Sequence, residues 1–225
     1  MIYVMSDLHG CYEKYRDMLE KIRFGEADTL YILGDVVDRG SGGIKILQDM
    51  MERKNIIPLR GNHDYIAGWL LQMLGQPKDI FAEVTEDFEL WLKDGGESTY
   101  RAFVKLSSEE QKQMIRFLRG FWDFQELDVG GRSFFMAHTV PKKARMMQPD
   151  TLKREDLLFE RAEYEKVYFP DRYIVTGHTP TALIDRAYTG RIYMKNNHIA
   201  VDCGAVFGLP LGCLCLDTME AFYVA

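Results

Sequence analysis

The sequence predicts an α/β fold (α+β in some schemes) in which a mixed β-sheet sandwich is flanked by helices. First, short runs rich in β-branched and aromatic residues alternate with helical segments over the first 60 residues, which favours βαβ units and parallel strands. Second, the earliest of these runs are almost continuously apolar, as in buried strands. Third, glycine and asparagine pairs later in the chain predict hairpins, and hence some antiparallel strands.

Eight runs are predicted as strands because they are too short for helices and are rich in branched or aromatic residues. Two segments between them, 12–22 and 44–51, repeat apolar residues at helical spacing. Hairpin turns are expected at Gly130-Gly131 and at Asn196-Asn197. The predicted strands are Ile2–Met5, Thr29–Leu33, Ile56–Leu59, Ser133–Ala137, Tyr173–Thr176, Ile199–Val201, Gly212–Leu216 and Ala221–Val224.

Residues 64–120 are predicted to be mostly helical. Ser107 or Ser108 can cap the N-terminus of the last helix, which would end at Gly120. No linker rich in proline, glycine or serine separates this segment from the rest. We therefore expect one domain over residues 1–225, with a mostly helical insertion at about 64–120.

The bulk composition restricts the class of protein. The 225 residues carry a net charge of −6, which disfavours a general grip on nucleic acid. No apolar run approaches the length of a membrane span, and the N-terminus does not read as a signal peptide. We expect a cytoplasmic protein with no nucleic-acid, membrane or obligate protein partner. Its four cysteines are expected to be reduced, buried thiols: Cys11, Cys203, Cys213 and Cys215.

Polar side chains follow five of the predicted strands at the point where each strand ends. In an open α/β sheet the carboxyl ends of the strands form the ligand-binding edge, because loops from neighbouring strands converge there. Four of the five histidines in the chain occur in these positions. The segments are "SDLHG" with Asp7 and His9, "GDVVDRG" with Asp35, Asp38 and Arg39, "RGNHD" with Asn62, His63 and Asp64, and the positions of His138 and His178.

This collection of side chains has the chemistry of a metal site. Carboxylate, amide and imidazole ligands without a thiolate suit Mn²⁺, Fe or Zn²⁺ better than Ca²⁺ or a structural zinc ion. The set holds more ligands than one tetrahedral ion needs, and a carboxylate such as Asp35 can bridge two ions. A pair of metal ions can clamp a phosphoryl group for in-line displacement.

The same motifs, in order, resemble those of the metallophosphoesterases (calcineurin-like phosphoesterases), and specifically the bacterial and phage type of serine/threonine phosphoprotein phosphatase. The resemblance extends from residue 6 to about residue 212 and includes "DCGAVFG". Arg39 in "GDVVDRG" marks the phosphoprotein phosphatases. Pro180 in "GHTP" stands where nuclease and phosphodiesterase branches carry a second metal-binding histidine.

The resemblance implies a role for each motif residue. His63 would donate a proton to the leaving oxygen and Asp38 would orient it. Arg39 would bind the phosphate, with Arg161 as a second phosphate ligand and Arg172 as the competing candidate. The implied metal ligands are Asp7, His9 and Asp35 for the first ion and Asn62, His138 and His178 for the second, with Asp35 as the bridge.

The implied function is direct phosphoester hydrolysis by a metal-bridging hydroxide. Two divalent transition metal ions are expected, with Mn²⁺ favoured and Fe or Zn as alternatives. The favoured substrate is a phosphoserine or phosphothreonine protein. The alternative is a dinucleoside tetraphosphate or another small phosphoester or pyrophosphate. Outside enzymes, the chain could be a phosphoprotein-binding module with an inactive site.

Several residues near the motifs carry weaker expectations. Asp64 is equally suited to capping a helix and to chemistry, and Asp202 is expected to support the site. His198 is expected at the surface, whereas Trp69 and Trp91 are expected in the core. The loops at 91–100 and 141–150 are candidates for opposite rims of the site. Ser6 and Thr139 depart from residues common in the family.

Overall fold

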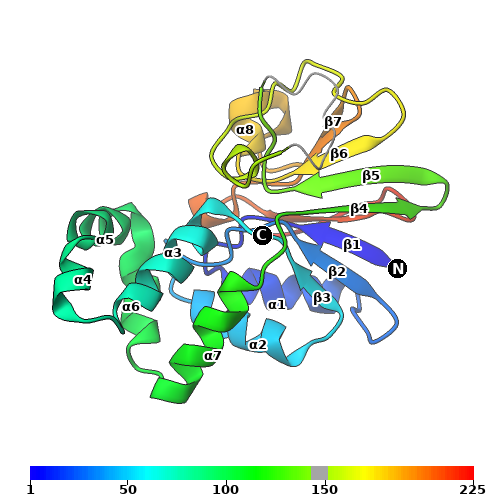
Figure 1. Ribbon diagram of the computed structural model, residues 1–225. Coiled ribbons are helices and arrows are strands. Elements are labelled where there is room, and N and C mark those ends of the chain that lie inside the picture. Colours follow the sequence, from blue (N-terminus) through cyan, green and yellow to red (C-terminus); the bar gives the residue numbers. More distant parts are fainter. Residues whose placement is uncertain (143–151) are drawn as a thin grey trace.

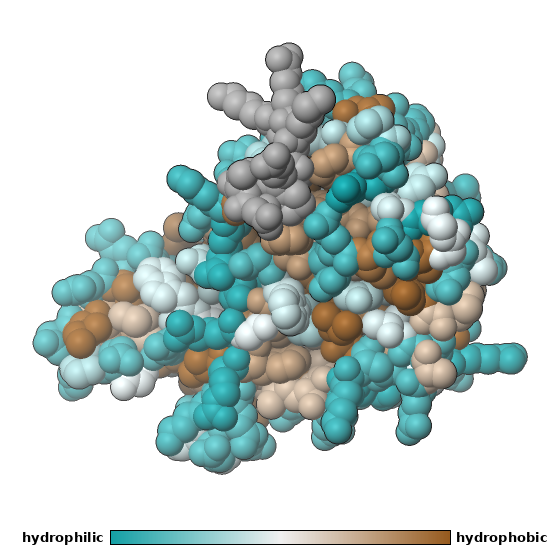
Figure 2. All heavy atoms as spheres, turned by 45° about the vertical axis from the view of Figure 1, so that its right-hand side comes forward, coloured by the Kyte–Doolittle hydropathy of each residue, from teal (hydrophilic) through white to brown (hydrophobic). Residues whose placement is uncertain are grey.

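Two five-stranded sheets pack face to face and have helices outside them (Figure 1). The computed structural model describes residues 1–142 and 152–225. Within these residues, no helix has both the length and the apolar character needed to cross a membrane. On the face shown in Figure 2, hydrophilic residues separate small hydrophobic patches.

The first sheet has the strand order β10-β9-β1-β2-β3. Strands β1, β2 and β3 are parallel, as the alternation of strand and helix predicted, whereas β9 pairs antiparallel with both β1 and β10. The bounds are β1 (Ile2–Met5), β2 (Thr29–Ile32), β3 (Ile56–Pro58), β9 (Leu211–Cys215) and β10 (Ala221–Val224).

The second sheet has the order β4-β5-β6-β8-β7 and is also mixed. Antiparallel hairpins form both of its edges, β4–β5 and β7–β8, around a parallel centre. Asn196 and Asn197 both have positive φ, as the two-residue turn of the second hairpin requires. The bounds are β4 (Phe124–Val129), β5 (Arg132–Ala137), β6 (Tyr173–Thr176), β7 (Tyr193–Lys195) and β8 (His198–Ala200).

Alternating side chains of each strand belong to different cores. Val4 faces the second sheet, whereas Tyr3 and Met5 face the helices. Phe134 likewise lies between the sheets, and Phe135 packs on the outer face of the second sheet. This period of two fixes the register, because a slip by one residue would exchange the two faces.

Helices cover the outer face of the first sheet, below it in Figure 1. Helix α7 begins with a capping box, in which Ser107 accepts from the backbone N–H of Glu110 and the Glu110 carboxylate accepts from that of Ser107. A π-helical turn, Leu92–Gly96, joins α5 to α6. The helices are α1 (Tyr12–Lys21), α2 (Gly43–Glu52), α3 (Asn62–Met73), α4 (Lys78–Ala82), α5 (Thr85–Trp91), α6 (Glu97–Phe103) and α7 (Ser108–Arg119), with α8 (Thr181–Ile184) beside the second sheet.

The predicted fold class is confirmed, and the eight predicted strands match eight of the observed ones to within one residue at each end; β4 and β7 were expected only as partners in the two hairpins. The four cysteines are free, and three are buried. The predicted helical segment packs on the same core as the first sheet. The single-domain organisation itself stays a prediction.

Two placements were wrong. His198 is only 1% exposed, because it lies at the start of a central strand and its Nε2 is 2.9 Å from the Thr176 hydroxyl. Trp69 is 40% exposed, because it lies on the solvent side of α3. Helical spacing alone did not show which face of this helix is covered.

Candidate metal centre at the strand ends

Backbone strain marks the candidate site. Ten non-glycine residues in the described part of the chain have positive φ. Six of them are predicted site residues, a concentration typical of functional positions. They are Asp7, His9, Asp35, Asp38, Arg39 and His178.

Gly177 lets two of these segments approach each other closely. A Cβ atom there would lie 1.9 Å from the Ser6 hydroxyl and 2.3 Å from Asp7 Oδ2. Because no side chain intervenes, the backbone N–H of His178 donates to Asp7 Oδ2 at 2.9 Å. The two sheets therefore meet at this point, through the loops that follow β1 and β6.

The first donor group comes from the loops after β1 and β2. His9 Nδ1 contacts the carbonyl oxygen of Val37 at 3.0 Å, which directs Nε2 towards the carboxylates. Nε2 lies 3.4 Å from Asp35 Oδ2 and 4.0 Å from Asp7 Oδ1. Asp7 Oδ2 accepts from Ser6, so Oδ1 is the oxygen that faces His9.

The second donor group joins Asn62, at the start of α3, to the two histidines after β5 and β6. His138 Nε2 lies 2.9 Å from Asn62 Oδ1 and 3.0 Å from His178 Nδ1. Asn62 Oδ1 and His178 Nδ1 are 3.1 Å apart. His138 Nδ1 contacts the Leu33 carbonyl oxygen at 2.8 Å, which holds the ring in this orientation.

The donor geometry fits divalent metal ions. Ligands at right angles around an ion, with bonds of about 2.1 Å, lie about 3.0 Å apart, close to the separations of the second group. The Nδ1 atom of His138 faces a backbone carbonyl oxygen, so Nε2 is the nitrogen that faces the site, and it lies 3.6 Å from Asp35 Oδ2. His9 faces the same oxygen in the same way. Unprotonated imidazole nitrogens and a carboxylate oxygen that face one another in a buried site repel each other unless a cation lies between them.

Asp35 is common to both donor groups, as the bridging role requires. Its Oδ2 lies 3.4 Å from His9 Nε2 in the first group and 3.6 Å from His138 Nε2 in the second. Burial raises the pKa of the Asp35 carboxyl, but the surrounding histidines outweigh burial and hold it well below its usual range. The Asp35 carboxylate is therefore charged, as a metal ligand must be.

One ring nitrogen of His63, Nδ1, points away from the two donor groups. Its Nδ1 lies 2.8 Å from Asp38 Oδ2, a carboxylate with no exposed surface. Burial lowers the pKa of His63, but the hydrogen bond to Asp38 and the charge of Asp35 outweigh it and raise the pKa to about 9. His63 therefore carries a proton at neutral pH.

Two residues that the sequence analysis did not assign to the site hold Asp38 in place. The Trp91 indole N–H donates to Asp38 Oδ2 at 2.8 Å, and the Thr99 hydroxyl donates to Oδ1 at 2.7 Å. Trp91 is buried, as expected, but it is also a partner of the site. The segment 91–100 thus supports Asp38, and its Asp94 reaches 3.9 Å from His63 Nε2.

Arg39 lies above the donor groups and is exposed. Its guanidinium nitrogens are 2.6 Å from His9 Nε2 and 3.0 Å from His63 Nε2. Its guanidinium also lies over the ring of Phe207, 5.7 Å from the ring centre. Arg39 thus connects the two histidines to the rim of the site.

Arg161 is the better of the two candidates for the second phosphate ligand. It is exposed. Burial and the neighbouring His138 lower the pKa of His178 most, and the positive charge of Arg161 lowers it further. Arg172 instead pairs with Glu126 on the neighbouring hairpin, at the opposite end of β6. The Thr139 hydroxyl donates to the carbonyl oxygen of Glu160, the residue before Arg161, at 2.9 Å.

The structure also gives the positions of Asp64 and Asp202, the two other acidic residues near the motifs. Asp64 acts as a structural cap: its carboxylate accepts from the backbone N–H groups of Asp35, Val36 and Gly61. Asp202 is buried and accepts from the N–H of Gly204. The loop expected at 141–150 lies largely outside the described residues.

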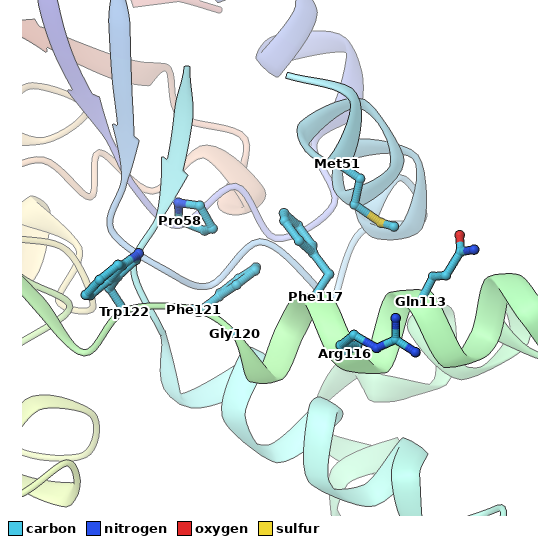
Figure 3. A pocket seen from close by; sticks show the side chains of 8 residues that line it. All are labelled: Met51, Pro58, Gln113, Arg116, Phe117, Gly120, Phe121 and Trp122. Carbon is cyan, nitrogen blue, oxygen red and sulfur yellow. The ribbon is translucent and has the colours of Figure 1, made fainter. Parts of the chain in front are cut away.

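Another cavity, of about 580 Å³, lies between α2, β3 and α7 (Figure 3). Aromatic side chains line it, among them Phe117, Phe121 and Trp122. It contains none of the donor residues, so the candidate site is defined by converging polar atoms and not by the size of a cavity.

Comparisons with known proteins identify the family of this chain. The model of the calcineurin-like phosphoesterase family matches residues 1–205. A symmetrical bis(5'-nucleosyl)-tetraphosphatase of Wigglesworthia glossinidia brevipalpis is 36% identical over 132 residues, which cover 56% of this chain and 47% of that protein.

Two solved structures show the same fold. A candidate diadenosine tetraphosphatase matches 99% of this chain and 92% of its own, with a TM-score of 0.68 and 15% identity. A serine/threonine phosphatase from Saccharomyces cerevisiae matches 100% of this chain and 80% of its own, with a TM-score of 0.61 and 16% identity.

The matches to curated relatives are partial: the chain spans less than half the length of those compared here. The family match, in contrast, covers most of the chain and all of the predicted site residues. This chain belongs to the calcineurin-like phosphoesterase family.

Proposed function

We propose that this protein is a metal-dependent hydrolase that cleaves dinucleoside tetraphosphates. The observation that carries the proposal is the convergence of two donor groups on Asp35, beside a histidine–aspartate pair and an exposed arginine. The curated relatives favour this substrate, which was the alternative in the sequence analysis, over a phosphoprotein.

The two donor groups would hold the metal ions: Asp7, His9 and Asp35 for one, and Asn62, His138 and His178 for the other, with Asp35 shared. When bound, divalent ions would neutralise phosphate oxygens and lower the pKa of a water molecule. Their identity is proposed as Mn²⁺, on the basis of the mixed oxygen and nitrogen ligands.

Arg39 and His63 would act together on the phosphate. When His63 is protonated, neither its Nε2 nor the arginine nitrogen 3.0 Å away can accept from the other. Both therefore present N–H groups to an anionic oxygen. Arg161 would add a second positive charge on the side of His178.

His63 would then release its proton to the leaving oxygen. Asp38 stabilises the charged ring through Nδ1, and Trp91 and Thr99 prevent Asp38 from turning away. Despite burial, the hydrogen bond to Asp38 and the charge of Asp35 raise the pKa of His63 to about 9, which favours the protonated ring at neutral pH.

A substrate panel tests the proposal. We expect Mn²⁺-dependent hydrolysis of diadenosine tetraphosphate with ADP as the product, and loss of this activity in Asp35→Asn. Turnover of phosphoserine and phosphothreonine peptides should be slower. Hydrolysis of these peptides, without hydrolysis of diadenosine tetraphosphate, would instead support the protein phosphatase.

The protein phosphatase is the second candidate, because Arg39 within "GDVVDRG" is typical of that branch. A binding module without activity is the third, and it would turn over no phosphoester at any metal concentration. A cytoplasmic location and the lack of an obligate partner stay predictions.

A further inference from the structure

Phe207 is an exposed aromatic side chain at the rim of the candidate site. It retains 64% of its surface. The Arg39 guanidinium lies over its ring at 5.7 Å and contacts His9 and His63 from the same position. The ring is therefore separated from the site histidines by a single guanidinium group.

The loop that carries Phe207 is firmly held. Lys14, on α1, donates to the carbonyl oxygen of Ala205 at 3.1 Å and to that of Leu209 at 2.6 Å. Gly204 and Gly208, on either side of the short helical turn Ala205–Phe207, both have positive φ. Phe207 is thus exposed because the loop presents it, and not because it is loosely attached.

We propose that Phe207 is a stacking platform for the base of a nucleotide whose phosphates lie at the donor groups. The inference rests on the proposed function and deepens it, since it assigns the residue that recognises the nucleoside. An arginine suited to phosphate beside an exposed aromatic ring offers one contact for each half of a nucleotide.

An isolated exposed aromatic residue is common on protein surfaces and by itself indicates nothing. Trp122 is such a residue: it is 61% exposed, and the cavity of Figure 3 that it lines contains none of the donor residues. Phe207 differs through its contact with Arg39 and the anchoring of its loop by Lys14. Trp122→Ala is therefore the matched control.

Steady-state kinetics give the first test. Phe207→Ala should raise KM for diadenosine tetraphosphate about 10- to 100-fold, the usual effect of losing one base–aromatic stack, with a smaller change in kcat. The inhibition constant of inorganic tetraphosphate, which lacks bases, should change less than about twofold. Phe207→Tyr should keep the wild-type KM, whereas Phe207→Leu should resemble Phe207→Ala.

Equilibrium binding separates this inference from the proposed function. ADP should bind the wild-type protein more tightly than pyrophosphate does, and Phe207→Ala, but not Trp122→Ala, should remove that difference. If diadenosine tetraphosphate is not hydrolysed but this pattern holds, the platform stands and the proposed substrate fails. If hydrolysis occurs and Phe207→Ala leaves KM and ADP binding unchanged, the platform is wrong. The platform would also be wrong if Phe207→Ala weakened the binding of a phosphotyrosine peptide but not the binding of ADP.

Discussion

The two sheets contribute to the candidate site in different ways. Loops of the first sheet supply the carboxylates Asp7, Asp35 and Asp38, together with His9 and the amide of Asn62 at the start of α3. Loops of the second sheet supply only imidazoles, His138 and His178. The carboxylates thus lie on one side and the two imidazoles on the other, so that a cation would link the two sheets.

The sheets also differ in their outer layers. Regular amphipathic helices cover the first sheet. The outer face of the second sheet is covered mainly by aperiodic chain, from which Tyr164 and Tyr168 pack around His198. The candidate site thus depends on two sheets with different sequence signals: helical periodicity marks the segments that cover the first sheet, and no periodicity marks those that cover the second.

The residue shared by both groups should have the largest effect. Asp35→Asn removes the negative charge that lies between the two donor groups, so we expect loss of bound metal. The fall in kcat/KM should be well beyond the roughly 100-fold that is typical when a residue supporting a metal ligand is replaced. Metal analysis and hydrolysis of diadenosine tetraphosphate measure this. Asp128→Asn, on the distant β4, is the control. Normal metal content in Asp35→Asn would contradict the shared role.

Substitutions specific to one sheet should separate the two groups. His9→Ala weakens the first group and His178→Ala the second, so each variant should lose one of two ions and nearly all activity. Mn²⁺ titration followed by calorimetry counts the ions. An unchanged stoichiometry in both variants would break the comparison between the sheets.

The proton donor should matter less than the metal ligands. His63→Asn should keep both ions and slow turnover by about 10²–10⁴-fold, because a proton must still reach the leaving oxygen. The loss should be smaller for p-nitrophenyl phosphate, whose leaving group needs little help. An equal loss of turnover for substrates with good and poor leaving groups would show that His63 does not protonate the leaving oxygen.

The support of Asp38 should have a modest effect. Trp91→Phe removes one hydrogen bond, worth about 0.5–1.5 kcal/mol, while Thr99 still holds the carboxylate. We expect a kcat lowered about 2- to 10-fold. Trp69→Phe, on the solvent side of α3, should not alter it. Equal kcat values for the two variants would show that the indole contact is not used.

The smallest effect on activity is expected for His198, where stability changes instead. Burial lowers its pKa to about 3, whereas the unfolded chain titrates near 6.5. Between these values only the unfolded state takes up the proton, so stability falls as the pH falls. From pH 7 to pH 5, the wild type should lose about 2 kcal/mol more than His198→Gln in urea unfolding. Equal losses of stability in the wild type and in His198→Gln would contradict a lowered pKa of His198.

Much of the fold could be predicted because local signals agree with the global structure. Strand runs, two hairpin turns and the cap at Ser107 were all visible in the sequence. The convergence of motif residues was also predictable, because parallel strands bring their carboxyl ends to one edge.

Contacts between distant segments could not be predicted. Trp91 and Thr99 reach Asp38 across 53 and 61 residues, and no spacing encodes such contacts. The burial of His198 depends on tyrosines from a segment without periodicity. For Trp91, the glycine pair that follows it in "WLKDGG" was the available signal, since glycines often permit close approach.

Anomalous diffraction from crystals soaked in Mn²⁺ tests the central claim most directly. Two peaks should appear, both beside Asp35, one next to His9 and the other next to His138 and His178. A single peak elsewhere, or no peak at these side chains, would contradict a metal pair held between the two sheets.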